Sequence, residues 1–183
     1  MTRGLIIGII AASAVVCFTT PGMGAPVESI PALEESYLQK AAERHQAEVA
    51  IGQLALQKAA SDRVKQYAAR MIQDHQRVIE DVQKLIRKEG ELSMPHQEIQ
   101  RKLSQLSGKD FDKAYMSFAV QDHEKDLGQL EQRASTVTNP RVQHWMADAL
   151  QIMKDHLGEA KAVATAMGIS PQSEPIIQDS TSQ

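Results

Sequence analysis

The sequence predicts an all-α protein, a four-helix bundle with a short helix in the connection between the second and third long helices. Two observations predict this class. Apolar residues recur at steps of three and four in four long segments, which places them on one face of each helix. Each of these faces also carries an imidazole or a carboxylate where an apolar core residue is expected. The pattern therefore indicates a bundle with a polar centre.

Residues 1–24 have the order of a secretory signal peptide. Arg3 is followed by an uncharged apolar run and then by small residues, with cleavage expected near Gly24. The run is shorter than the roughly 18 residues at which a membrane-spanning helix is considered. We therefore expect an exported protein, periplasmic or associated with the outer membrane, whose mature chain is not inserted in the membrane. An uncleaved membrane anchor is the alternative.

Charge and cysteine content limit the function of the mature chain. Cys17, the only cysteine, lies inside the apolar run, so no disulfide is expected after cleavage, and stability must come from packing or a metal. Removing Arg3 leaves nineteen basic and twenty-three acidic residues, a net charge of −4 without basic blocks. This balance gives no reason to expect nucleic acid as a partner. The remaining length suits one domain.

The first long helix is predicted over residues 31–60, with its N-terminus near Ser29 and Pro31. His45, Glu48 and Gly52 lie on its apolar stripe, and the small residues of the stripe would let a neighbouring backbone approach closely. The second helix is expected to fold back antiparallel after residues 61–62 and to end at Gly90. His75 is the polar residue in the middle of its stripe.

The connection over residues 91–108 contains a short amphipathic segment that begins at Pro95 and carries Ile99, Leu103 and Leu106 at helical spacing. Helices of about 27 residues are ~40 Å long. Twelve helical and six extended residues span about 38 Å, so this connection can barely cross the length of the bundle. We predict such a crossover, and a simple up-down-up-down bundle is the alternative.

Ser107 and Asp110 resemble a capping box that opens the third long helix, with His123 central in its stripe. The fourth helix is predicted to begin at Asn139, followed by a proline, and to end at Gly168. Its stripe contains His156. We expect the bundle to occupy residues 25–168 and the tail over residues 169–183, rich in Ser and Gln, to be disordered.

The two halves of the chain resemble each other. Gly52-Gln53-Leu54 matches Gly128-Gln129-Leu130, and Asp74-His75 matches Asp155-His156. This pattern suggests a duplicated helical hairpin, although the intervals between the matching residues differ by two or three positions.

The inward polar residues are expected to meet at the centre of the bundle. Glu48 lies thirteen residues before Ser61 and His75 fourteen after it, while His123 lies sixteen before Asn139 and His156 seventeen after it. Buried carboxylates and imidazoles need partners. We therefore predict one divalent transition metal, such as Zn, Fe, Cu or Mn, and the alternative is a hydrogen-bonded core. The predicted ligands are Glu48, His75, His123 and His156, with His45 and Glu124 as further possible ligands.

No catalytic motif is present in the mature sequence, which has no cysteine, no serine elbow and no glycine-rich phosphate loop. We accordingly predict no catalytic residue and no organic cofactor, and the sequence points to no protein partner, although a homo-oligomer is possible. His144 and Asp148 have metal-compatible spacing, but His144 is off the core stripe and is expected at the surface.

Several short segments resemble the domain-of-unknown-function 4142 family, and the likeness covers residues 34–167. The segments are Ala47-Glu48-Val49, Gly52-Gln53-Leu54-Ala55, Met71-Ile72-Gln73-Asp74-His75, His123-Glu124 and Asp155-His156-Leu157. The resemblance implies an exported bacterial protein of the ferritin-like superfamily, without a settled activity.

The chain departs from the ferritin-like di-iron pattern, which has Glu-x-x-His on two helices. Ile72, Val120 and Met153 stand three residues before the inward histidines. This departure favours a single-metal or metal-free centre over a ferroxidase or oxygenase. Two hypotheses follow: a metal-binding ferritin-like protein that serves metal or oxidative stress of the cell envelope, and a metal-free structural or protein-interaction module.

Overall fold

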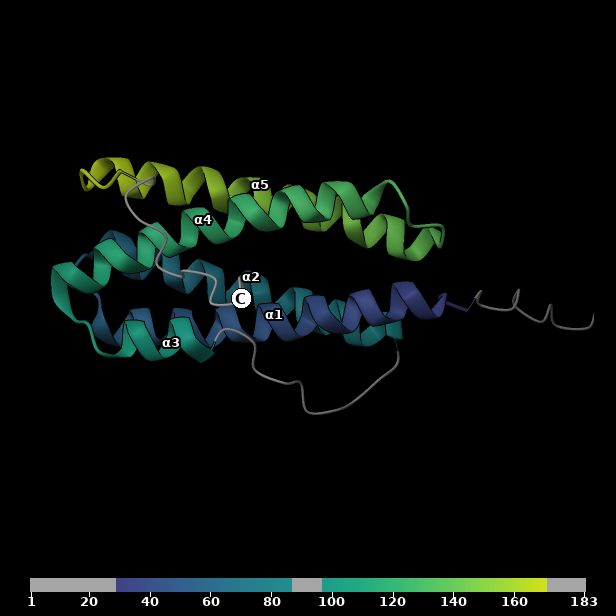
Figure 1. The fold of residues 1–183 in the computed structure, drawn as a ribbon, viewed down its shortest axis with the longest axis horizontal. Helices are drawn as coiled ribbons and strands as arrows, with labels where there is room; N and C mark the ends of the chain where they lie inside the picture. Colours follow the sequence, from purple (N-terminus) through teal and green to yellow (C-terminus); the bar gives the residue numbers. More distant parts are fainter. Residues whose placement is uncertain (1–28, 87–96, 171–183) are drawn as a thin grey trace, which may run out of the picture.

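The chain forms two antiparallel helical hairpins that pack side by side along their length (Figure 1). In this computed structural model, residues 29–86 and 97–170 are described. The first hairpin contains α1 and α2, and the second contains α4 and α5, while the short α3 packs against α1 and α4. The helices are α1 (Ala32–Lys58), α2 (Asp62–Ile86), α3 (Gln97–Ser104), α4 (Gly108–Ala134) and α5 (Pro140–Ala166). The predicted all-α four-helix bundle with a short helix in the connection is confirmed.

The connection between the hairpins crosses the length of the bundle. Ala59, just after α1, forms a parallel bridge with Gly108 at the start of α4. The start of α4 therefore lies beside the α1–α2 turn, at the opposite end from the last turn of α2 (Figure 1). The predicted crossover is confirmed, and an up-down-up-down arrangement is excluded. Gly90 and Pro95 lie outside the described residues.

Two apolar clusters fill the bundle, one toward each end. Near the α1–α2 turn, the core is built around Tyr67 and Phe111, whereas at the other end it is built around Leu38 and Trp145. The inward histidines lie between these clusters along each long helix. The polar centre is thus flanked on both sides by residues that exclude water.

The helix ends follow the predicted chemistry in part. The Asn139 side chain accepts hydrogen bonds from the first backbone N–H groups of α5, and Gly168 takes φ +69°, so both predicted boundaries of this helix are confirmed. The predicted capping box of α4 is wrong, since the Ser107 side chain makes no capping hydrogen bond. The chain instead enters α4 through Gly108 at φ +63°, in the left-handed region that glycine tolerates.

A buried carboxylate ties the hairpins together at each end of the bundle. Asp112 of α4 accepts hydrogen bonds from the backbone N–H groups of Ala60 (3.0 Å) and Ser61 (2.9 Å) in the α1–α2 turn. At the other end, Glu34 of α1 accepts from the backbone N–H (2.8 Å) and hydroxyl (2.9 Å) of Thr138 in the α4–α5 turn. These contacts fix how one hairpin sits against the other.

Within residues 29–86 and 97–170, no helix is both long and apolar enough to cross a bilayer. The predicted signal peptide and residues 171–183 of the predicted tail lie outside the described part of the chain. Ile169, the first residue of the predicted tail, is buried in the apolar cluster near the α1–α2 turn. The packed part of the chain therefore extends past the expected boundary at Gly168.

Candidate metal centre

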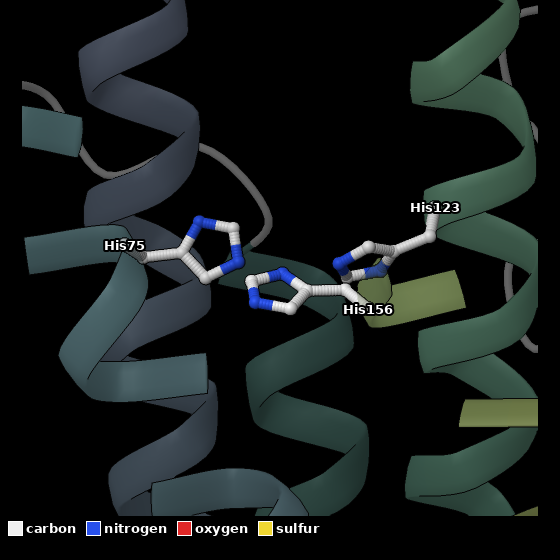
Figure 2. A group of neighbouring side chains, drawn as sticks. All are labelled: His75, His123 and His156. Atoms are coloured by element: carbon white, nitrogen blue, oxygen red, sulfur yellow. The ribbon is translucent and has the colours of Figure 1, made fainter. Parts of the chain in front are cut away.

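Three histidines from three helices converge at the middle of the bundle, His75 from α2, His123 from α4 and His156 from α5 (Figure 2). Their ring centroids lie 5.2 Å (His75–His156), 5.6 Å (His123–His156) and 6.0 Å (His75–His123) apart. One ring nitrogen from each lies within 4.8 Å of the others. All three side chains are at most 3% exposed, so water does not compete for these nitrogens.

Hydrogen bonds at the far side of two rings decide which nitrogen carries the proton. His123 Nδ1 lies 2.9 Å from the Ala119 carbonyl oxygen, and His156 Nε2 lies 2.9 Å from Asp74 Oδ2. Both oxygens only accept, so these two nitrogens must be the protonated donors. The remaining nitrogens, His123 Nε2 and His156 Nδ1, carry lone pairs. Both are buried without a hydrogen-bond partner among the described residues.

His75 joins the cluster to α1. Its Nδ1 lies 2.5 Å from Nδ1 of His45, and its Nε2 lies 2.8 Å from Oε2 of Glu48. His75 Nε2 and both Glu48 oxygens nevertheless lack a partner with hydrogen-bond geometry in the described part of the chain. Two ligand atoms that share one metal, each about 2.1 Å from it, lie about 3.0 Å apart in octahedral and about 3.4 Å apart in tetrahedral geometry. The 2.8 Å between this nitrogen and oxygen is slightly shorter, so a small shift of either side chain would bring them to the spacing of neighbouring ligands.

Burial keeps the imidazoles of His45, His123 and His156 neutral. Desolvation, reinforced by His75, lowers the pKa of His45 to about 3, and desolvation lowers the pKa of His123 to about 4 although Glu48 opposes it. Burial also lowers the pKa of His156. Burial would raise the pKa of Glu48, but His75 and His123 outweigh this effect and hold the pKa below its ordinary value. At neutral pH the centre thus combines the uncharged imidazoles of His45, His123 and His156 with the ionised carboxylate of Glu48.

An acidic group adjoins the histidines on the α1–α4 side. Carboxylate oxygens of Glu48, Asp122 and Asp126 lie within 4.8 Å of one another, and Arg44 of α1 forms an ion pair with Asp126. Burial, Glu48 and Asp126 raise the pKa of Asp122 to about 8. The guanidinium of Arg44 supplies part of the positive charge that this group requires.

The structure brings together five of the six residues that the sequence suggested as ligands. Glu124 is the exception, because it lies at the surface with its carboxylate 2.7 Å from the Lys161 ammonium. His144 is exposed, as expected. From the sequence, Asp74, Asp122 and Asp126 are among the carboxylates that could surround the ligands, although a solvent-exposed face is the commoner role for such charges. Sequence reasoning overlooked Arg44, whose only signal was its place beside His45. The residues brought together are His45, Glu48, His75, His123 and His156.

Comparison with known proteins identifies the family of the chain but gives no activity for that family. No curated protein and no solved structure was found to match the chain. A family model described as "Domain of unknown function (DUF4142)" matches residues 22–163, which include α1, α2, α4, most of α5 and the whole histidine cluster. The chain therefore belongs to the DUF4142 family.

Proposed function

We propose that this protein binds one divalent transition metal ion at the centre of the bundle. Its ligands would be His75 Nε2, His123 Nε2, His156 Nδ1 and the carboxylate of Glu48. The observation that carries the proposal is that these buried atoms have no hydrogen-bond partners among the described residues, while His75 offers ligand atoms within 4.8 Å both of those of His123 and His156 and of that of Glu48. Each such atom costs about 1–3 kcal/mol when it is left unsatisfied. A bound cation would satisfy all of them together.

The surrounding residues have defined roles in this proposal. His45 orients His75, the Ala119 carbonyl orients His123, and Asp74 orients His156, each through the ring nitrogen that faces away from the metal. Three imidazoles and one carboxylate suit Zn²⁺, and also Fe²⁺, Mn²⁺ or Cu²⁺. The metal would supply Lewis acidity or redox chemistry according to its identity. No residue of the chain is assigned to catalysis.

We further propose that the centre belongs to an exported ferritin-like protein of the cell envelope, in metal homeostasis or oxidative stress. The signal-like order of residues 1–24 supports export. Two hairpins joined by a lengthwise connection support the ferritin-like assignment. Sequencing the mature N-terminus tests the location, and Ala25 is the expected first residue.

The second candidate is a metal-free structural or protein-interaction module. Two contacts favour it, because part of the polar core is satisfied by the protein itself. His45 and His75 contact each other through their Nδ1 atoms, and Arg44 pairs with Asp126. In this case the polar core would set the register of the helices.

Elemental analysis of the full chain, produced with its own N-terminus and purified without a His tag, separates the two candidates. We expect one metal per chain in the wild type and none in the His75→Ala and His156→Ala variants. The His144→Ala variant should keep its metal, because that side chain is exposed. A chelator should lower the melting temperature of the wild type, since the metal stabilises only the folded state. A wild type that contains no metal and shows no melting shift with any first-row divalent ion would contradict the proposal.

A further inference from the structure

A cavity of about 440 Å³ lies between the four long helices, next to the candidate metal centre. His45 and His75 form part of its wall, and both are buried. Lys40 and Arg133 also line it, and both are exposed, so they mark the side that opens to solvent. The volume is within the range of about 300–1,000 Å³ that is typical of small-molecule sites.

The charge of this cavity is positive. Its lining contains three cationic side chains, Lys40, Arg44 and Arg133, and a single carboxylate, that of Asp126. Arg44 and Asp126 pair with each other. Lys40 and Arg133 form no ion pair within the described part of the chain, which leaves two positive charges at the opening. Such a lining concentrates anions and repels free metal cations.

Apolar groups form another part of the wall. Tyr37 and Trp145 meet edge to face with ring centroids 6.3 Å apart, and Leu130 and Ile152 also line the cavity. The guanidinium of Arg133 lies 5.3 Å from the centroid of the Tyr37 ring, so cationic and aromatic surfaces adjoin each other. A purely inorganic oxyanion would place some of its oxygens against this apolar wall, where they lose hydrogen bonds to water without gaining a partner. An organic anion can place its charged group beside the cations and its apolar group against the aromatic rings.

We propose that this cavity binds a small organic monocarboxylate. The carboxylate contacts Lys40 and Arg133 at the opening, where cationic donors form charge-assisted hydrogen bonds. The apolar part of the ligand packs against Tyr37 and Trp145, close to His45 and His75. The site is formed by the chain itself and does not require a metal, so it is independent of the proposed metal function.

The fluorescence of Trp145 can report binding, because Trp145 is the only tryptophan of the chain and lines the cavity. The full-length protein, stripped of metal and freed of chelator, is titrated with benzoate and hexanoate while the tryptophan emission is recorded. Benzamide and hexanamide have nearly the same shapes without the charge. We expect a saturable change with both carboxylates and binding weaker by about tenfold or more with the amides.

The Lys40→Gln/Arg133→Gln double variant should bind the carboxylates about tenfold more weakly or worse, since both cations at the opening are lost. Lys154→Gln is the matched control, because Lys154 is an exposed lysine of α5 that pairs with Glu131 and does not line the cavity. Unchanged circular dichroism shows that the variants fold. Equal binding of acids and amides, equal binding by the double variant, or no saturable change with either carboxylate would overturn the proposal. None of these results bears on the metal content of the protein.

Discussion

Each histidine of the centre uses its two ring nitrogens differently. The outward nitrogen of His123 donates to a backbone carbonyl, and that of His156 donates to Asp74. The inward nitrogens are left with lone pairs in a site that water does not reach. Because an imidazole with its proton fixed at one nitrogen can bind a metal only through the other, these outer contacts prepare the cluster before any ion arrives.

The contact with Asp74 leads to a prediction about affinity. Asp74→Ala removes the acceptor that fixes the His156 proton, so the affinity for the metal should fall about 10–100-fold. Asp155→Ala is the matched control, because Asp155 stands at the equivalent place before His156 but, among the described residues, accepts only from the exposed Gln151 side chain. Competition with a chromophoric chelator measures both affinities. Equal losses in the two variants would contradict a role for Asp74 in orienting His156.

Acidification should destabilise the metal-free protein between pH 6.5 and pH 4. His45 and His123 have pKa values of about 3 and about 4 when folded, whereas unfolded imidazoles titrate near ~6.5. Between these pKa values, His45 and His123 bind protons in the unfolded chain but not in the folded chain. Their contribution to stability therefore falls as the pH falls. Each such group changes the free energy of unfolding by about 1.4 kcal/mol per pH unit, and the two together change it by about 2.7 kcal/mol per pH unit. Urea unfolding at pH 7, 6 and 5 measures the slope.

The His45→Gln variant serves as the control for this titration. It removes one of the two groups, so it should lose about half of the slope contributed by His45 and His123. A His45→Gln variant whose free energy of unfolding changes with pH in the same way as that of the wild type would show that the buried His45 ring does not resist protonation.

For single residues, the sequence predicted those that lie on a core stripe, left the role of Asp74 open between a residue around the ligands and a surface charge, and missed Arg44. Glu48 and His75 follow from helical periodicity alone. Asp74 and Arg44 each precede a stripe histidine, and their inward contacts depend on how the helices rotate against their neighbours. Glu124 follows His123 directly and is therefore turned about 100° away from it on the helix, which explains its place at the surface.

At the scale of the helices, α1 and α2 approach each other closely at Gly52. A Cβ atom built there would lie 2.9 Å from Ile72 Cγ1 and 3.4 Å from the backbone oxygen of Ala68. The small residues of the α1 stripe predicted this kind of contact. The periodicity also located every long helix within a few residues. It placed the end of α1 at residue 60 instead of Lys58, because Ala59 adopts an extended conformation and pairs with Gly108, which no local pattern indicates.

Substitution of two glycines at matching places in the two halves tests this packing. Gly52→Leu should destabilise the protein by about 1–3 kcal/mol, because the new side chain has no room against α2. Gly128→Leu should stabilise it by about 0.5–1 kcal/mol, since Gly128 is exposed with nothing within 4 Å of a Cβ and leucine favours the helix. Chemical denaturation gives both values. The same sign of change at both glycines would show that α1 and α2 are not closely packed at Gly52.

Across the whole molecule, the arrangement of the hairpins depends on the crossover and on the two buried carboxylates at the ends. The lengths of the helices and of residues 91–108 were sufficient to predict the crossover. The roles of Asp112 and Glu34 were not predictable, because each accepts hydrogen bonds from a turn more than fifty residues away in sequence. From the helix pattern alone, both residues look like ordinary acidic residues near the start of a helix.

Asp112→Ala should lower the stability of the protein by on the order of 3 kcal/mol, because the backbone N–H groups of Ala60 and Ser61 lose a charged acceptor in a partly buried turn. Asp110→Ala is the matched control. Asp110 is exposed in the first turn of α4, two residues before Asp112, so its loss should cost less than about 1 kcal/mol through the helix dipole. Thermal and urea unfolding compare the two. Similar losses would show that the contact between α4 and the α1–α2 turn contributes little.

The proposed ligands divide equally between the hairpins, with Glu48 and His75 in the first and His123 and His156 in the second. Each half alone offers only two donors, a weak chelate. The covalent crossover turns the joining of these two chelates into an intramolecular event with a high effective concentration. If the chain were cut between α2 and α3, the two hairpins would have to associate as a heterodimer. The metal would then bridge the two fragments, and its binding would depend on the concentration of the fragments.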